Sequence, residues 1–190
     1  MINPYLISTN HQKILSFFVL HPGVSFYERE IARKSGLSPS STHYVLARLY
    51  RAGVINRKQN GRMYFYSVDK TNPYPKEFKV LTNLLLIEPL VEKLKGLSHK
   101  IILFGSWAEG SDNEDSDIDL FIISSEKEKA LSVVNKFSYS AKLYNRKVQP
   151  IINAPEELLK KGKEERVFLE QVEKGKVLLE REINGNSSEF

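Results

Sequence analysis

The sequence predicts a two-domain α+β protein, in which three helices and a β-hairpin precede a small mixed-sheet α/β domain. Residues 10–52 carry apolar side chains at helical spacing, and two short β-type runs joined by Asn-Gly follow them. From residue 99 onward, strand-type and helix-type segments alternate. Residues 1–70 hold 10 basic and 3 acidic residues, and residues 71–190 hold 18 basic and 20 acidic ones. A net charge of +7 in the first segment and −2 in the second indicates two modules with different partners. Chance variation of surface charge is the alternative.

Two helices are expected at the start of the first module. The first covers residues 10–21, with Asn10 as its N-cap and the His-Pro-Gly segment at 21–23 as its stop. The second opens at Ser25, where Glu28 three residues later would complete a capping box. Gly36 should end this second helix.

A third helix and a hairpin complete the module. Ser38 is the expected N-cap, and Pro39 stands at the first helical position, where proline is favoured. The helix should run to about residue 52. The β-type runs at 54–58 and 63–68 flank Asn60-Gly61, which is a strong hairpin signal.

Three helices followed by a basic-tipped hairpin resemble a winged helix-turn-helix domain over residues 10–69. The resemblance implies DNA as a partner, with the third helix in the major groove and the wing against phosphate. The candidate base readers are Ser40, Ser41, Tyr44 and Arg48. The candidate phosphate contacts are Arg51, Arg57, Lys58 and Arg62. The alternative is a winged helix that makes only protein contacts.

The segment after the hairpin predicts a junction. Pro73 and Pro75 stiffen its start, a helix should cover residues 76–87, and Pro89 should break or restart it before residues 90–97. Apolar side chains cover more than one face near residue 87, so this helix should be buried within the chain or against a second copy. A homodimer through this segment is a hypothesis, because two winged helices would then read a two-fold site.

The second module should contain four strands. The expected strands are 99–104, 116–124, 147–152 and 176–180. The expected helices are a short one from Ser106, then 126–139, 155–163 and 165–173, and a polar tail follows residue 181.

Two carboxylates lie beside a glycine turn in this module. Gly105 and Ser106 follow an apolar strand, and Asp117 and Asp119 stand two residues apart at the next one. Residues i and i+2 of a strand point to the same face, so the two charges repel unless a cation or a proton lies between them. Oxygen ligands suit Mg²⁺ (or Mn²⁺), and a glycine turn with a serine at a helix start suits a phosphate. Together these groups predict nucleotidyl transfer chemistry.

The pattern Gly-Ser-(x)₁₀-Asp-x-Asp between two strands resembles the minimal nucleotidyltransferases of the DNA polymerase β superfamily. The resemblance implies that Gly105 and Ser106 bind a nucleoside triphosphate, and that Asp117 and Asp119 hold the metal. Together with the winged helix and the segments 146–157 and 168–176, the chain also resembles a group of small, mostly prokaryotic proteins over nearly its whole length.

Three departures from the family pattern bear on activity. The third carboxylate of the superfamily falls at Gln149, whose amide is neutral and cannot act as a base. Trp107 and Glu109 stand where relatives often carry arginine. The loop acids Asp112, Glu114 and Asp115 are expected to be solvated, with a spare metal ligand as the alternative.

We expect a DNA-binding winged helix at 1–70, connecting helices at 71–97, a minimal nucleotidyltransferase domain at 98–182 and a tail at 183–190. The leading hypothesis is a protein that binds Mg-NTP and transfers a nucleoside monophosphate to a protein or nucleic-acid acceptor. The alternatives are a transcriptional regulator with a degenerate, nucleotide-sensing domain, and a nucleotidyltransferase-type antitoxin. The chain has no cysteine and no apolar run of membrane length, so we expect a cytoplasmic protein without a membrane partner.

Overall fold

The computed structural model describes residues 6–69, 72–158 and 163–181, which fall into two compact units. The first unit combines Met1–Leu85 with Gly110–Glu114, and the second combines Leu86–Glu109 with Asp115–Phe190. The division lies inside helix α4 (Pro73–Leu94). One loop from the second half of the sequence therefore belongs to the first unit.

The first helix, α1 (Asn10–Leu20), matches the predicted range of 10–21 closely, but Asn10 is its first helical residue and not its N-cap. Its N-cap is Thr9, because the Thr9 hydroxyl accepts a hydrogen bond from the Gln12 backbone N–H, and the Gln12 side-chain oxygen accepts one from the Thr9 backbone N–H. This reciprocal pair is a capping box, so the prediction of Asn10 as N-cap was wrong.

The second helix, α2 (Glu28–Ser35), begins later than predicted. Phe26–Tyr27 forms a short strand, β1, and the N-cap Tyr27 makes no side-chain capping bond. The prediction of a capping box from Ser25 to Glu28 was therefore wrong. The physical reason is tertiary, since Phe26 is buried and pairs with Tyr66 across the sheet.

The third helix, α3 (Pro39–Arg51), confirms its predicted start. The Ser38 hydroxyl accepts a hydrogen bond from the Ser41 backbone at 3.2 Å, and Pro39 occupies the first turn. The apolar stripe of α3 is buried, while basic side chains occupy the last turn.

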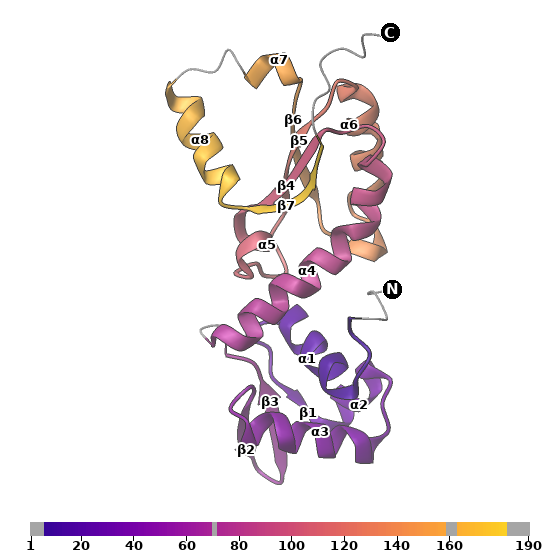
Figure 1. Ribbon diagram of the computed structural model, residues 1–190. Coiled ribbons are helices and arrows are strands. Elements are labelled where there is room, and N and C mark those ends of the chain that lie inside the picture. The colour runs from indigo at the N-terminus through magenta and orange to yellow at the C-terminus, as the bar shows by residue number, and fades with distance from the viewer. Residues whose placement is uncertain (1–5, 70–71, 159–162, 182–190) are drawn as a thin grey trace. The chain divides into compact units, whose positions relative to one another are not determined.

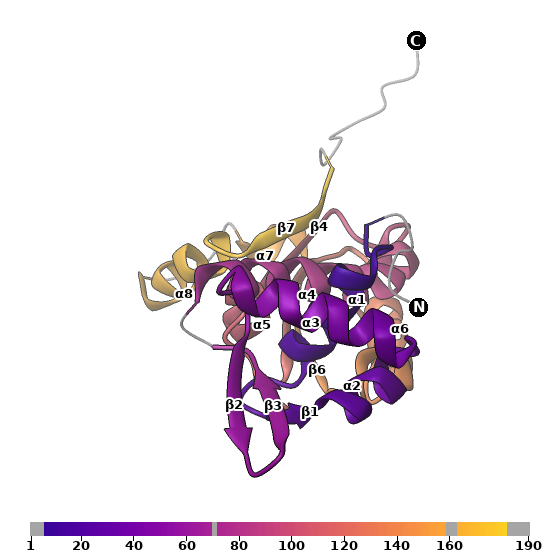
Figure 2. The same ribbon diagram turned by 90° about the horizontal axis from the view of Figure 1, so that it is seen from below.

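The hairpin consists of β2 (Asn56–Asn60) and β3 (Met63–Ser67), and Figure 2 shows it extending away from α3. The strand order is β1-β3-β2, so β3 is central. The loop is Gly61-Arg62, and Gly61 has a φ of +60°, a conformation that glycine adopts without strain.

Helices α1 to α3 and the sheet enclose one hydrophobic core. Its buried members come from the three helices, from β1 and β3, and from two positions just outside the hairpin strands: Ile14, Phe17, Phe18, Phe26, Ile31, Val45, Leu46, Leu49, Ile55, Tyr66 and Val68. This arrangement is the predicted winged helix.

Helix α4 runs unbroken for 22 residues through Pro89. The predicted break at Pro89 was wrong, because a proline inside a helix removes only one backbone donor and packing can retain the helix. Its apolar residues Ile87, Leu90 and Leu94 are fully buried within the chain. The apolar segment that suggested a homodimer is thus accounted for without a second copy.

The second unit is built on a four-stranded mixed sheet, as predicted. Its strands are β4 (Lys100–Phe104), β5 (Ile118–Ile123), β6 (Val148–Asn153) and β7 (Lys176–Glu180). The order is β6-β5-β4-β7, with β5 and β6 parallel and the other pairs antiparallel.

Helices cover both faces of this sheet. Helices α6 (Lys127–Phe137) and α8 (Lys163–Glu173) lie on opposite sides of it, as Figure 1 shows. The smaller elements are α5 (Gly105–Glu109), η1 (Ala141–Leu143) and α7 (Pro155–Leu158). The predicted helix at 155–163 falls partly on residues 159–162, and the predicted tail at 183–190 falls wholly, outside the described residues.

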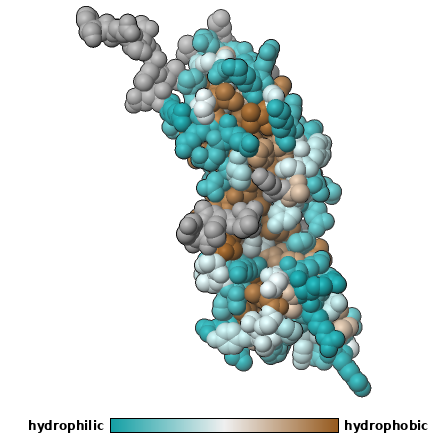
Figure 3. Space-filling model, turned by 90° about the vertical axis from the view of Figure 1, so that its right-hand side faces the viewer, coloured by the Kyte–Doolittle hydropathy of each residue, from teal (hydrophilic) through white to brown (hydrophobic). Residues whose placement is uncertain are grey.

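The surface is largely polar on the face seen in Figure 3, where hydrophobic residues lie between hydrophilic ones. No helix in the described part of the chain has the length and apolar character needed to span a membrane.

Candidate active site and nucleic-acid interface

Asp117 and Asp119 come together at the start of strand β5. Asp117 directly precedes the strand, and Asp119 is its second residue. Asp119 pairs with Phe104 of β4 on one side and with Gln149 of β6 on the other. Both strands neighbouring β5 therefore fix the backbone that carries this carboxylate.

The pKa of Asp119 is raised above its ordinary value. Burial is the larger cause and the charge of Asp117 is the second. Both effects disfavour the ionised form, which is the state that binds a cation. A divalent cation between the two carboxylates would remove this penalty, so the pair is electrostatically suited to one.

The backbone at Gly105 lies directly against the Asp119 carboxylate. A Cβ at this position would stand 2.6 Å from Oδ2 of Asp119, and the φ of Gly105 is +68°. Only glycine meets both conditions without strain. The structure thereby places the predicted turn beside the predicted carboxylate.

Ser106 follows Gly105 in α5, a helix of only five residues. Trp107 and Ala108 are buried and fix the helix to the core of the unit. The large Trp107 side chain thus has a packing role.

Gln149 occupies the position that sequence reasoning identified. Its side-chain nitrogen donates a hydrogen bond to Oδ2 of Asp117 at 3.0 Å, and its backbone is in register with Asp119. An amide in this place orients Asp117 but adds no negative charge and cannot accept a proton as a base.

Within the described residues, no third acidic or imidazole side chain completes a metal-binding cluster. Two aspartates still fit Mg²⁺, because this ion is commonly held by one or two carboxylates together with substrate phosphates and water. The donor set therefore suits a cation that arrives with a nucleotide better than a tightly held resident metal.

Comparison with protein families agrees with this geometry. A family model described as polymerase beta, nucleotidyltransferase matches residues 88–184, which is more than half of the chain. The chain belongs to the polymerase beta nucleotidyltransferase family. A second model, winged helix-turn-helix DNA-binding, matches residues 7–56. The chain thus joins a DNA-binding winged helix to a nucleotidyltransferase domain.

Wider comparisons add little to these two families. Reduced HlyU from Vibrio cholerae N16961 is 22% identical, over 43% of this chain and 75% of that chain, with a TM-score of 0.30. A score that low supports no structural argument. No curated protein matches the sequence.

The candidate base readers lie on or near one side of α3 in the winged helix. Tyr44 is 56% exposed, and Nη1 of Arg48 donates a hydrogen bond to its hydroxyl at 2.6 Å. Ser40 and Ser41 take part in the hydroxyl network of Ser38 at the N-terminus of α3. Arg51 is exposed at the other end of the helix.

The candidate phosphate contacts of the wing divide into two kinds. Lys58 and Arg62 are exposed on β2 and in the hairpin loop. Arg57 instead lies between two tyrosine rings, 4.4 Å from the Tyr50 centroid and 4.5 Å from that of Tyr64. Its guanidinium therefore packs the wing together as well as contributing charge.

The expectation for one loop acid was wrong. Asp112 is only 5% exposed, and Lys79 contacts its Oδ2 at 3.1 Å and its backbone carbonyl. Asn83 donates to Oδ1 at 2.8 Å. Glu114 and Asp115 are exposed, as expected for solvated acids.

Lys79 and Asn83 are the residues that sequence reasoning missed. They stand four positions apart in a helix whose neighbouring side chains are mostly apolar. A polar i, i+4 pair inside an apolar stretch was the available signal, but it does not reveal a partner about 30 residues away.

Proposed function

We propose that this is a DNA-binding protein whose nucleotidyltransferase domain binds Mg²⁺–NTP (or Mn²⁺–NTP) and transfers a nucleoside monophosphate to an acceptor hydroxyl. The supporting observation is the contact of the Gly105 backbone with Asp119, beside the paired charge of Asp117. We assign Asp117 and Asp119 to the metal, and Gly105 and Ser106 to the triphosphate. We expect the protein to act in the cytoplasm.

Each assigned group has a physical reason. Gly105 has no Cβ, so a phosphate can approach the backbone beside Asp119. A cation held by the two aspartates would neutralise phosphate charge and activate the acceptor oxygen. Gln149 would keep Asp117 oriented through its 3.0 Å hydrogen bond.

The proposed transfer needs no reagent other than the nucleotide, the acceptor and water. The acceptor oxygen forms a bond to the α-phosphorus, and the bond from that phosphorus to the bridging oxygen breaks. Pyrophosphate leaves with the electron pair. Gln149 cannot take the hydroxyl proton, so the proton passes to water. This absence of a base at position 149 predicts slow transfer.

The second candidate is a regulator whose domain senses a nucleotide without transferring it. The Gln149–Asp117 hydrogen bond favours this second candidate, because an amide occupies the position at which a transfer reaction would use a carboxylate. An antitoxin acting on a partner protein is a special case of the first candidate, distinguished only by its acceptor.

The test uses each of the four NTPs labelled at the α-phosphate, with Mg²⁺ or Mn²⁺ and protein, DNA and RNA acceptors. Label transfer that disappears in Asp117→Ala and Asp119→Ala, and persists in the exposed loop control Glu114→Ala, supports transfer. Gln149→Glu should accelerate it, by about 10²-fold if the new carboxylate acts as a general base. Nucleotide binding without transfer, even in Gln149→Glu, supports the sensor. Failure of the wild type to bind any NTP overturns both.

For DNA, we assign base reading to Ser40, Ser41, Tyr44 and Arg48, and phosphate contacts to Arg51, Arg57, Lys58 and Arg62. The exposure of Tyr44 and Arg48 on α3 supports the first assignment. Replacing Arg48 by alanine should relax sequence preference, whereas replacing Arg51 should weaken binding uniformly across sequences.

A further inference from the structure

The loop Gly110–Glu114 belongs to the unit that contains the winged helix, although it connects parts of the nucleotide site. Its backbone lies against α4, because a Cβ on Gly110 would stand 2.7 Å from the carbonyl oxygen of Lys76. Asp112 is then held by Lys79 and Asn83 of the same helix. The loop is thus fixed by packing and by a polar network at once.

The Lys79–Asp112 ion pair is buried, with both side chains 5% exposed. Burying two charges costs about as much as their attraction returns, so such a pair contributes little net stability compared with apolar side chains. Removing one partner, however, leaves an uncompensated charge and is strongly unfavourable. The pair therefore selects one arrangement of the loop more than it stabilises the fold.

Both ends of this loop run directly into the candidate site. On one side it follows α5, which carries Gly105 and Ser106. On the other side, Asp115 and Ser116 lead to Asp117. A displacement of the loop must therefore be absorbed within a few residues of the phosphate-binding turn or of the metal-binding aspartates.

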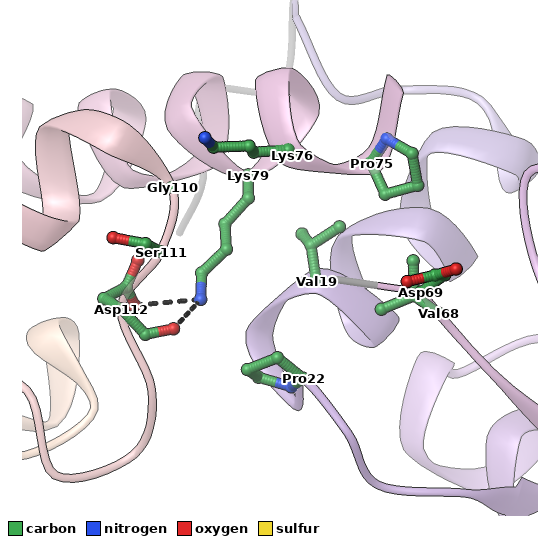
Figure 4. A pocket seen from close by; sticks show the side chains of 10 residues that line it. All are labelled: Val19, Pro22, Val68, Asp69, Pro75, Lys76, Lys79, Gly110, Ser111 and Asp112. Atoms are coloured by element: carbon green, nitrogen blue, oxygen red, sulfur yellow. Dashed lines mark hydrogen bonds and ion pairs between the residues drawn. The ribbon is translucent and has the colours of Figure 1, made fainter. Parts of the chain in front are cut away.

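A cavity of about 230 Å³ adjoins the ion pair within the first unit. Figure 4 shows Lys79 reaching Asp112 at its edge, with Val19 of α1 and Val68 beyond β3 on the other side. This space beside the ion pair gives the lysine room for a second arrangement. The winged-helix residues bordering that space would respond to such a movement.

We propose that Lys79 and Asn83 are positioning residues that act through Asp112 and couple nucleotide binding at the Asp117–Asp119 site to DNA binding by the winged helix. This inference rests on the proposed function. Coupling is reciprocal, so a nucleotide that changes DNA affinity by some factor is itself bound differently by that factor when DNA is present.

The test is a thermodynamic cycle on the full chain. DNA affinity is measured with and without saturating Mg²⁺ and each of ATP, GTP, CTP and UTP, and nucleotide binding is measured separately by equilibrium dialysis. The wild type should show a change in DNA affinity of about fivefold or more with at least one nucleotide. The variant Lys79→Met/Asp112→Leu replaces the pair with apolar side chains, and the change should fall below twofold.

A matched control is Lys100→Met/Glu180→Leu, which removes a 2.7 Å ion pair confined to the second unit and should retain the wild-type coupling. If Lys79→Met/Asp112→Leu fails to fold by circular dichroism, Asn83→Leu takes its place, because it removes the 2.8 Å hydrogen bond to Asp112 while keeping the Lys79–Asp112 ion pair, and it should also reduce the coupling.

The outcomes separate the two proposals. A wild type that binds none of the four nucleotides overturns the proposed function. A wild type that binds nucleotide and DNA independently overturns the coupling alone. Undiminished coupling in the folded variant overturns the roles of Lys79 and Asn83.

Discussion

The backbone of Gly105 lies against the Asp119 carboxylate, and this contact gives a residue-scale prediction. Gly105→Ala adds a Cβ that would stand 2.6 Å from Oδ2 of Asp119, at a φ of +68°. The left-handed conformation alone costs about 1–2 kcal/mol for alanine. The clash must be relieved by moving the carboxylate, so Mg²⁺ binding should also weaken.

Gly53→Ala separates these two effects. Gly53 has a φ of +69° and no atom within 4 Å of an added Cβ, so it carries the same backbone strain without the clash. Urea unfolding should show the larger loss of stability in Gly105→Ala, and calorimetric titration should show weaker Mg²⁺ binding only there. Equal losses and unchanged Mg²⁺ binding would contradict the close contact.

The raised pKa of Asp119 predicts a stability that depends on pH. In the metal-free protein, burial and the charge of Asp117 raise this pKa above its unfolded-state value. Between the two values the native state binds more protons than the unfolded state, so stability falls as pH rises through that window. Asp119→Asn should therefore be more stable than wild type at pH 7 with EDTA, and this advantage should shrink below about pH 4.

Urea titrations at both pH values check this prediction. Glu170→Gln, an exposed acid on α8, is the control and should be nearly neutral at either pH. Mg²⁺ should raise the stability of the wild type and have little effect on Asp119→Asn. A variant that is less stable than wild type at pH 7 without metal would show that the carboxylate is stabilised by contacts other than a cation.

At the scale of elements, the two arginines of the wing have different roles, because one packs against aromatic rings and the other is exposed. Arg57 lies between the rings of Tyr50 and Tyr64, whereas Arg62 is exposed in the hairpin loop. Arg57→Lys keeps the charge but loses the planar stack, so it should destabilise the wing by about 1 kcal/mol. The measurement is thermal unfolding, with Lys58→Arg as the control for a basic exchange on the same strand. An unchanged melting temperature would indicate that the stack carries no stability.

Lys58 and Arg62 should contact the DNA phosphates through their charge alone. The double variant Lys58→Ala/Arg62→Ala should weaken DNA binding equally for all sequences and reduce the slope of log K against log salt by about 2. Lys174→Ala, an exposed lysine of the second unit, controls for net charge and should leave the slope nearly unchanged. An unaltered slope in the double variant would exclude these residues from the phosphate contacts.

Local chemistry explains which elements the sequence could predict. The start of α3 follows from Ser38 and Pro39, and the hairpin follows from a glycine turn between β-type runs. The errors occur where tertiary packing overrides a local signal. Burial and pairing draw Phe26 into a strand, and packing carries α4 through Pro89.

The same contrast holds for the candidate site. Gly105, Ser106, Asp117 and Asp119 occupy a short stretch of sequence, so their grouping could be predicted. The parallel register of β5 and β6, which aligns Gln149 with Asp119, is shown by the structure. The Asp112 network could not be predicted, because Lys79 is 33 residues away and its burial depends on how α4 packs. Loop acids are usually solvated, so sequence alone favoured the wrong environment.

At the scale of the whole molecule, the chain passes between its two units three times. It crosses within α4, then before Gly110, and again after Glu114. Helix α4 is shared by the two units, and the loop Gly110–Glu114 belongs to the first unit although both of its neighbouring segments belong to the second. Unfolding of one unit would therefore disturb elements of the other. Calorimetry should therefore show one transition, with an enthalpy of about 130 kcal/mol near 60 °C and equal calorimetric and van't Hoff values.

Gly110→Ala tests the source of that cooperativity. Its Cβ would stand 2.7 Å from the carbonyl oxygen of Lys76 at a φ of +71°, so the loop must shift away from α4. Gly36→Ala, with a φ of +67° and open space, is the control for backbone strain. Gly110→Ala should lower the melting temperature further than Gly36→Ala and broaden or divide the transition, because it loosens the loop that belongs to one unit and connects two parts of the other. Two transitions in the wild type, with Gly110→Ala moving only the one for the winged-helix unit, would show instead that the units unfold independently and that the loop contributes to one of them alone.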